Sequence, residues 1–204
     1  MQNNYFITNS DILRNKYFLV LCFYLKKNYN TNCIYNSLFL GYKYNYLLLN
    51  INVFIKSLKN ILNLIKLISN VNGEILILNT NNKIINYMLF QNCLKLNISY
   101  LTHFTAKQVN LLTYLKKLPD LVISFDYKTN AIFINKITQY NVPVICFTNI
   151  LNQNIIMNKL YYVIFNNKSI YANIIILYLV FNNIAKHKFI VTDQLKKKLN
   201  ASKL

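Results

Sequence analysis

The chain is poor in glycine and proline and has no tryptophan: its 204 residues include two glycines and two prolines. Two glycines are too few for the dinucleotide-binding pattern G-x-G-x-x-G, and the phosphate-binding motif G-K-[ST] does not occur. A backbone loop approaches a pyrophosphate closely only where glycine leaves room. We therefore expect no cofactor.

Cysteine and histidine are also scarce, and they are not clustered. The four cysteines show neither a C-x-x-C pair nor a regular spacing, and His103 and His187 lie far apart in the chain. Zinc needs clustered ligands, and nothing in the sequence places a histidine beside a serine or cysteine nucleophile. We expect no metal site, no disulfide framework and a reducing compartment.

No apolar run is long enough to cross a membrane. The longest runs, residues 17–25 and 174–181, fall short of the roughly 18–20 residues that span a bilayer. In the interrupted segment 46–68, apolar positions recur with the spacing of one helix face, which predicts a packed amphipathic helix over 51–70, with a membrane-surface helix as the alternative. The N-terminus resembles neither a secretory signal nor a transit peptide, so we expect that, if the protein works in an organelle, it is made there.

Acidic residues are rare as well. Five of them face 23 basic residues, which gives a formal net charge of +18. This excess cannot be neutralised within the chain and implies a polyanionic partner, either nucleic acid or an anionic membrane surface. The abundant residues (Asn, Lys, Ile, Tyr, Leu and Phe) have AT-rich codons, which indicates a very AT-rich genome, such as that of an organelle.

What the sequence does contain is an alternation of strand-like and helix-like segments. It predicts an α/β fold of the Rossmann-like (flavodoxin-like) type, a parallel sheet with helices on both faces. The expected strands cover 72–79, 97–104, 120–126, 142–149 and 160–165, with two short strands or a strand and a loop within 37–52. The expected helices cover 11–25, 51–70, 80–96, 129–140 and 169–184, with Thr80 or Asn81 and Ser169 as N-caps. We divide the chain into an N-terminal helix and polar loop (1–36), the Rossmann-like domain (37–185) and a basic tail (186–204), either solvated or bound to a partner.

Two of the five carboxylates bracket one short apolar run, LPDLVISFD. On an extended strand Asp120 and Asp126 would lie about 20 Å apart, too far to share a proton or a metal. Asp126 follows a strand at the edge where open α/β sheets bind ligands, and it precedes a helix whose free N–H groups it can satisfy. Capping is favoured over catalysis for this residue.

Several segments resemble one protein family, in order from about residue 37 to 185. NGEILILNTNNK resembles Gly-x-Ile-Leu-Phe-Val-Gly-Thr-Lys, and SLFLGYKYNYLLLNIN resembles a segment with Gly-x-Arg-Asn. LPDLVISFD matches Leu-Pro-Asp with a second aspartate six residues later, and VPVICFTN matches Ile-Pro-Val-x-x-x-x-Asp. Together with YYVIFNNKSIYANIIILYLV, these segments resemble the family of the second protein of the small ribosomal subunit.

The chain departs from this family in several places. The family's coiled-coil hairpin before Leu-Pro-Asp is absent, and its Trp-Leu-Gly-Gly segment survives only loosely, as THFTAKQVN. Asn149 stands in place of the aspartate after the V-P-V strand, and Phe165 and Asn166 stand in place of Pro-Gly. The resemblance implies a Rossmann-like sheet used as a ribosomal part, without nucleotide, small-molecule substrate or reaction, and the shortening fits an organelle-encoded copy.

The resemblance thus implies a structural constituent of the small subunit of an organellar ribosome, in a plastid (relict plastids included) or a mitochondrion. Its partners would be ribosomal RNA and neighbouring ribosomal proteins. The residues expected to contact RNA are Lys43, Asn45, Asn82, Lys83, Lys107, Lys116, Lys117, Lys186 and Lys188. Those expected to be structural are Asp120, Asp126, Pro143 and Ser169. Two alternatives remain: a doubly wound enzyme with a cleft at Asp126, and a basic membrane-surface protein.

Overall fold

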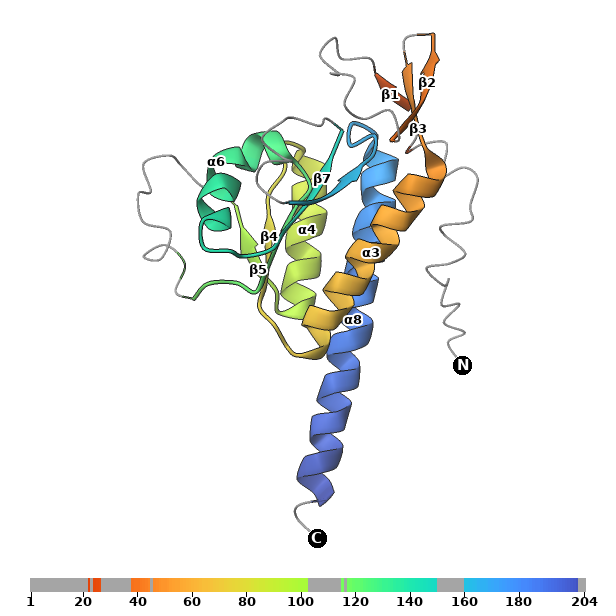
Figure 1. Cartoon of the computed structure of the whole chain (residues 1–204). Helices are drawn as coiled ribbons and strands as arrows, with labels where there is room; N and C mark the ends of the chain where they lie inside the picture. The colour runs from red at the N-terminus through yellow and green to blue at the C-terminus, as the bar shows by residue number, and fades with distance from the viewer. Residues whose placement is uncertain are drawn as a thin grey trace.

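The computed structural model describes residues 22, 24–26, 38–44, 46–102, 115, 117–149 and 160–201. These residues form two sheets and four helices (Figure 1). The larger sheet has five parallel strands: β4 (Ile75–Leu78), β5 (Ser99–Leu101), β6 (Leu121–Ser124), β7 (Val144–Thr148) and β8 (Tyr161–Ile164). The helices are α3 (Ile51–Asn70), α4 (Lys83–Leu96), α6 (Tyr127–Thr138) and α8 (Ile170–Ala201).

The strands of the larger sheet lie in the order β5-β4-β6-β7-β8. Counted along the chain within this sheet, the order is second, first, third, fourth and fifth, which is that of flavodoxin-like folds. All residues of β4, β6 and β7 are buried, as expected for parallel strands that are covered on both faces. The predicted fold class is confirmed.

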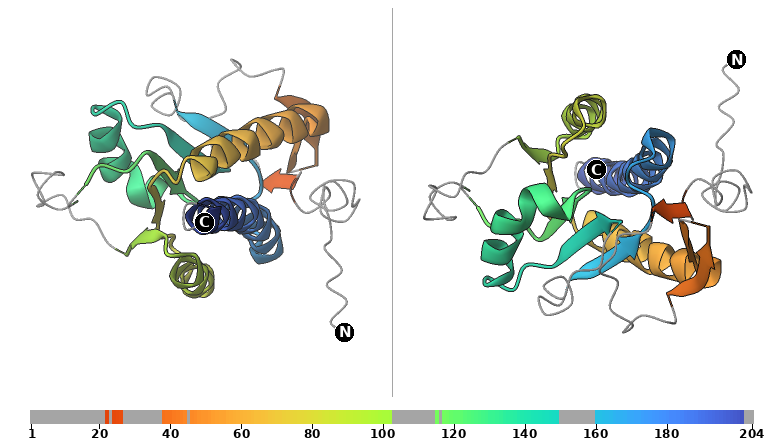
Figure 2. Two further views of the ribbon diagram at one scale, coloured as in Figure 1. Left: turned by 90° about the horizontal axis from the view of Figure 1, so that it is seen from below. Right: turned by 90° about the horizontal axis from the view of Figure 1, so that it is seen from above.

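Helices cover both faces of this sheet (Figure 2). Ile75 and Ile77 of β4 belong to a core shared with α3, α4 and α8, whereas Leu76 and Leu78 belong to a second core that contains Phe133 of α6. This division follows from the strand period of two, which sends alternate side chains to opposite faces.

The amphipathic helix is present at the predicted residues, and its apolar face is packed. In α3, Leu58 and Ile65 are fully buried, and the helix runs alongside α8. Nδ2 of Asn183 in α8 donates a buried hydrogen bond of 2.6 Å to the carbonyl oxygen of Leu62. The apolar face of α3, which a membrane-surface helix would insert into the lipid, is therefore covered by the rest of the protein. Within the described ranges, no helix is long and apolar enough to cross a membrane.

A smaller antiparallel sheet precedes α3. It contains β1 (Tyr24–Lys26), β2 (Phe39–Lys43) and β3 (Tyr46–Leu49) in the order β1-β3-β2. Of the two alternatives expected within 37–52, the structure has the two short strands, not a strand and a loop. The helix predicted over 11–25 is wrong at its C-terminal end, where Tyr24–Lys26 form the strand β1. Leu25 pairs with Leu47 across the β1–β3 ladder, and both side chains are buried. This long-range pairing overrides the local helical pattern, and residues 11–21 lie outside the described residues.

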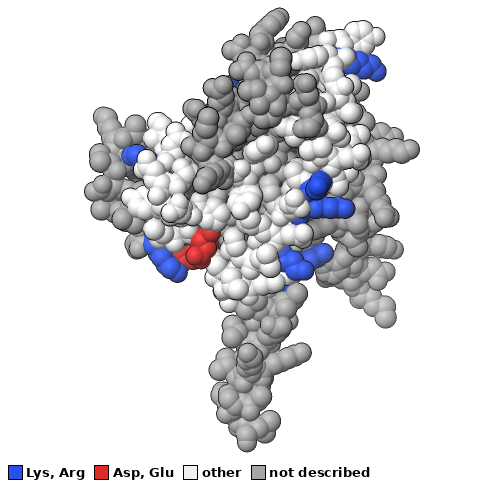
Figure 3. Space-filling view, in the orientation of Figure 1, with Lys and Arg blue, Asp and Glu red and all other residues white. Residues whose placement is uncertain are grey.

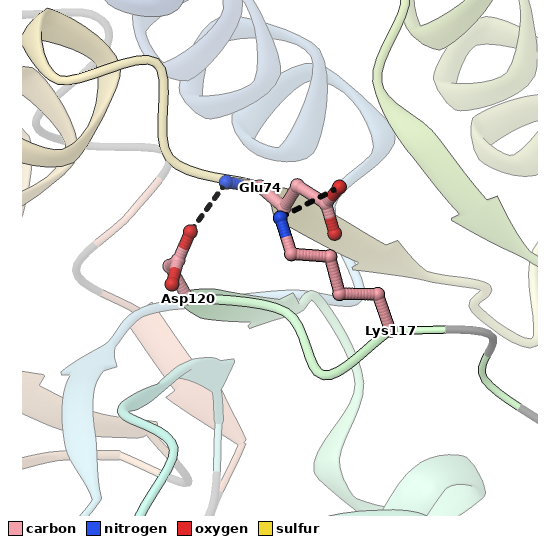
Figure 4. A network of polar contacts seen from close by, with 3 residues as sticks. All are labelled: Glu74, Lys117 and Asp120. Carbon is pink, nitrogen blue, oxygen red and sulfur yellow. Dashed lines mark hydrogen bonds and ion pairs between the residues drawn. The ribbon is translucent and has the colours of Figure 1, made fainter. Parts of the chain in front are cut away.

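Asp120 links the start of β6 to the start of β4 through hydrogen bonds with Glu74 (Figure 4). Its Oδ2 accepts from the backbone N–H of Glu74 at 2.8 Å, and its own N–H donates to the carbonyl oxygen of Glu74 at 2.9 Å. Nζ of Lys117 pairs with Oε1 of Glu74 at 3.3 Å. Gly73 is needed here, because an added Cβ would lie 2.6 Å from Cγ2 of Ile68. Asp120 therefore makes structural contacts where β6 begins.

Pro143 and Ser169 also have structural contacts. The carbonyl oxygen of Pro143 accepts from the N–H of Val122 at 3.1 Å, which extends the β6–β7 ladder. Oγ of Ser169 accepts from the N–H of Ala172 at 3.3 Å, as predicted for the cap of α8. That helix does not end at residue 184 but continues to Ala201, since no glycine or proline follows to end it. It therefore crosses the expected domain boundary at residue 185.

Candidate nucleic-acid interface

A hollow of about 700 Å³ lies at the carboxyl edge of the larger sheet. It is built by the segments that follow β4, β6, β7 and β8. Between β4 and β6 the strand order reverses, because β5 lies on the far side of β4. Open α/β sheets bind ligands at such switch points, and the volume lies within the roughly 300–1,000 Å³ of small-molecule sites.

Side-chain hydrogen bonds, rather than glycine, shape the loop after β4. Asn86 accepts from the N–H of Thr80 through Oδ1 at 2.7 Å and donates to the carbonyl oxygen of Thr80 through Nδ2 at 2.7 Å. Oδ1 of Asn82 accepts from the N–H of Ile84 at 2.9 Å, which makes Asn82 the N-cap of α4. The expected cap at Thr80 or Asn81 is therefore wrong, because the buried Thr80 hydroxyl accepts from the N–H of Asn82 and orders the loop instead.

Asp126 begins α6, and Asn130 joins this helix start to the end of β4. Oδ1 of Asp126 accepts from the N–H of Lys128 at 3.1 Å, so the predicted N-cap is confirmed and α6 begins two residues earlier than expected, at Tyr127. Nδ2 of Asn130 donates to the carbonyl oxygens of Asn79 at 2.7 Å and Asp126 at 3.0 Å. One buried amide thus holds together two walls of the hollow.

A second buried amide orders the segment after β8. Nδ2 of Asn173, whose residue is 2% exposed, donates to the carbonyl oxygens of Asn167 at 2.6 Å and Ser169 at 2.9 Å. Lys168 lies between these two acceptors, and its side chain is exposed at the hollow. The position of this lysine is therefore fixed at the backbone, while its ammonium group is available to a ligand.

Three lysines line the hollow, and each lies in or just before the first turn of a different helix. Lys83 is the first residue of α4, Lys128 lies in the first turn of α6, and Lys168 precedes α8. Helix N-termini add partial positive charge through their free N–H groups. Among the described residues of the lining, Asp126 is the one carboxylate, and it already caps α6. The site favours an anion, and lysine binds phosphate as a point charge.

The described side chains offer no metal centre and no activated thiol. No group of three or more His, Cys, Asp or Glu residues within the described ranges could hold a metal ion. Cys22, Cys93 and Cys146 are buried, and burial raises the pKa of each thiol to about 12. Such thiols stay protonated at neutral pH and behave as small apolar side chains.

The residues expected to contact RNA are spread over the molecule. Asn82 and Lys83 line the hollow, whereas Lys43 is exposed at the end of β2. Lys117 lies at the opposite edge of the sheet, in its ion pair with Glu74. On the face shown in Figure 3, acidic side chains form one small patch with a basic side chain beside it, and several other basic side chains lie over α3. Asn45, Lys107 and Lys116 lie outside the described residues.

Among the described side chains of α8, Lys188 contacts the rest of the protein. Nζ of Lys188 donates to the carbonyl oxygens of Leu96 at 3.1 Å and Asn97 at 3.4 Å, at the C-terminus of α4, where a cation is favoured. Burial lowers the pKa of Lys188. Lys186 is half-buried on the same helix. The contact of Lys188 with α4 accounts for its position without RNA.

Sequence reasoning did not identify Lys128, Lys168, Asn149 and Asn167 as lining residues, although all four line the hollow. A signal was present, because each follows the end of an apolar strand and the carboxyl ends of parallel strands meet at one edge of a sheet.

No protein-family model matches this chain, and no curated protein sequence does.

Proposed function

We propose that the chain is a structural constituent of the small subunit of an organellar ribosome, binding ribosomal RNA and neighbouring ribosomal proteins without catalysing a reaction. The observation that carries RNA binding is the convergence of three lysines and three helix N-termini on one hollow with a single carboxylate, among the described residues. With five acidic residues against 23 basic ones, the chain cannot neutralise its own charge. RNA phosphates supply the missing negative charge.

The ribosomal part of the proposal rests on the resemblance of the segments between residues 37 and 185. In the fold, Leu-Pro-Asp leads into β6 and Val-Pro-Val leads into β7. The flavodoxin-like sheet agrees with the fold that the resemblance implies. A plastid or a mitochondrion is the proposed site of action, because the composition points to an organelle genome.

The interface is tested by removing the lysines around the hollow together, in the variant Lys83→Ala/Lys128→Ala/Lys168→Ala. The matched control removes three exposed lysines from α3, in the variant Lys56→Ala/Lys59→Ala/Lys66→Ala, and changes the net charge equally. Affinity for small-subunit ribosomal RNA is measured as a function of salt concentration. Each lysine that contacts a phosphate should lower the slope of log affinity against log salt by about one unit when it is removed.

We expect the variant at the hollow to lose about two to three units of slope and the α3 variant less than one. Equal losses in both would show diffuse attraction to charge rather than an interface at the hollow. An unchanged slope in the variant at the hollow would contradict the assignment. Circular dichroism melting curves for both variants verify that each is folded.

A second candidate function is an enzyme or binding protein for a phosphorylated small molecule. The observation that favours it is the size of the hollow and its position beside Asp126 at the switch point. The two functions differ in what Asp126 must do. A catalytic carboxyl group takes part in the reaction, whereas in an RNA interface Asp126 caps α6 and its charge repels phosphate.

A further inference from the structure

The β2–β3 hairpin exposes a group of large side chains near its turn. Tyr42 is 55% exposed, Tyr44 90% and Tyr46 46%, and Leu40 is 65% exposed. Single exposed apolar residues are ordinary, but several aromatic ones on one short hairpin mark an interaction surface. We call Tyr42, Lys43, Tyr44 and Tyr46 the hairpin tip.

Tyr44 has a backbone conformation that does not suit it. Its φ is 54°, in the left-handed region, where a tyrosine is disfavoured relative to glycine or asparagine. The other non-glycine residues with positive φ within the described ranges are all asparagines, namely Asn72, Asn97 and Asn141. Asparagine and tyrosine are both encoded by AT-rich codons, so genome composition does not explain the exception. The ring at position 44 buries almost nothing of its own surface, and its presence points to a contact outside the chain.

The strand β2 has an irregular backbone before the hairpin tip. The β2–β3 register shifts between Phe39 and Gly41, and Gly41 has a φ of 142°, a conformation that side chains rarely adopt. A Cβ at Gly41 would meet nothing within 4 Å, so the glycine serves the backbone bend and not close packing. Such irregularities increase the local twist and redirect the side chains beyond them.

Charge indicates the kind of partner. Lys43 and Tyr46 are cross-strand partners, which places a cation and an aromatic ring on the same face of the hairpin. The chain has no acidic residue between Asp11 and Glu74, so no carboxylate lies on the hairpin. Aromatic rings beside a cation bind unpaired nucleotides, because the ring stacks on the base and the cation meets the phosphate.

We propose that the hairpin tip is a stacking site for unpaired bases of RNA, with Tyr44 as the principal ring and Lys43 on an adjacent phosphate. This rests on the proposed function, since it names a second contact with the same RNA. The site would be separate from the hollow in its chemistry: stacking adds affinity that does not depend on salt, whereas the lysines around the hollow add affinity that does.

The first test replaces Tyr44 by residues that separate fold from function. The Tyr44→Asn variant suits the left-handed backbone, so its unfolding midpoint should equal or exceed that of the natural chain. Its affinity for small-subunit ribosomal RNA should fall about five- to a hundredfold, with an unchanged salt slope. The Tyr44→Phe variant should keep most of the affinity. A Tyr87→Asn variant, which removes a tyrosine that is 66% exposed on α4, is the control and should bind RNA normally.

The second test uses the absence of tryptophan from the chain. In the Tyr44→Trp variant, the added indole is the sole tryptophan, and stacking should quench its fluorescence. We expect quenching by single-stranded oligoadenylate and little by the same strand paired with oligouridylate. Equal quenching by the duplex, or none by either RNA, would overturn the stacking site. So would a response to vesicles of phosphatidylglycerol and phosphatidylcholine in place of RNA.

The two proposals fail in different ways. If the chain binds ribosomal RNA with a slope that depends on Lys83, Lys128 and Lys168 but the Tyr44 variants bind normally, only the stacking site is wrong. If the natural chain binds no RNA at all, the proposed function fails and the stacking site fails with it.

Discussion

Among the described residues, three of the four non-glycine positions with a left-handed backbone are asparagines, Asn72, Asn97 and Asn141. Other asparagines cap helices or tie loops together, as Asn82 and Asn130 do at the hollow. Asparagine tolerates the left-handed region and bonds to nearby backbone groups. A chain with two glycines can therefore still build the sharp loops of a parallel α/β fold.

Asp126 offers a residue-scale test that separates the two candidate functions. Asparagine caps helices about as well as aspartate, so Asp126→Asn should leave the free energy of unfolding within about 0.5 kcal/mol, whereas Asp126→Ala should lower it by about 1 kcal/mol. Removing a negative charge beside three lysines should tighten RNA binding severalfold. Chemical denaturation and RNA titration measure the two effects.

Unchanged RNA binding by Asp126→Asn, with its stability also unchanged, would show that RNA phosphates do not lie beside this carboxylate. That result would favour the phosphorylated small molecule over RNA as the occupant of the hollow.

At the scale of elements, the sequence predicts what depends on local pattern and misses what depends on distant partners. The apolar runs that became β4, β6 and β7 are recognisable because strands buried on both faces are apolar throughout. The strand β1 is not, since Leu25 is placed by its pairing with Leu47. The start of α4 was expected one or two residues too early because Thr80, Asn81 and Asn82 are all suitable caps. Only the contact of Thr80 with Asn86 shows that Thr80 orders the loop while Asn82 caps the helix.

The packing of α3 gives an element-scale prediction that bears on the membrane-surface alternative. Leu58 is 0% exposed on the face toward the core, and Leu67 is 66% exposed on the same helix. Leu58→Ala should lower the free energy of unfolding by about 2–5 kcal/mol because it leaves a cavity. Leu67→Ala should change it by less than about 0.5 kcal/mol. Thermal or urea unfolding measures both.

Similar small effects of the two α3 substitutions would contradict a packed helix. A helix that worked at a membrane surface would instead lose binding to anionic vesicles in both variants, without need of RNA.

On the scale of the whole molecule, the net charge and the fold both favour an anionic partner. The chain has a formal net charge of +18, and the carboxyl edge of its parallel sheet carries lysines near three separate helix starts. The edge itself was predictable, because open α/β sheets share it. The participation of Lys128 and Lys168 was not, since it depends on how segments after β6 and β8 meet across the sheet. The lysine-rich composition alone does not distinguish Lys128 and Lys168 from Lys117 or Lys188.

The most direct test of the central claim is the sedimentation of the chain in a gently prepared organelle lysate on a sucrose gradient, with and without ribonuclease. Mass spectrometry of the fractions locates the chain. We predict that it migrates with the small ribosomal subunit and that ribonuclease releases it. A light or membrane-bound peak that ribonuclease does not change would contradict the ribosomal function.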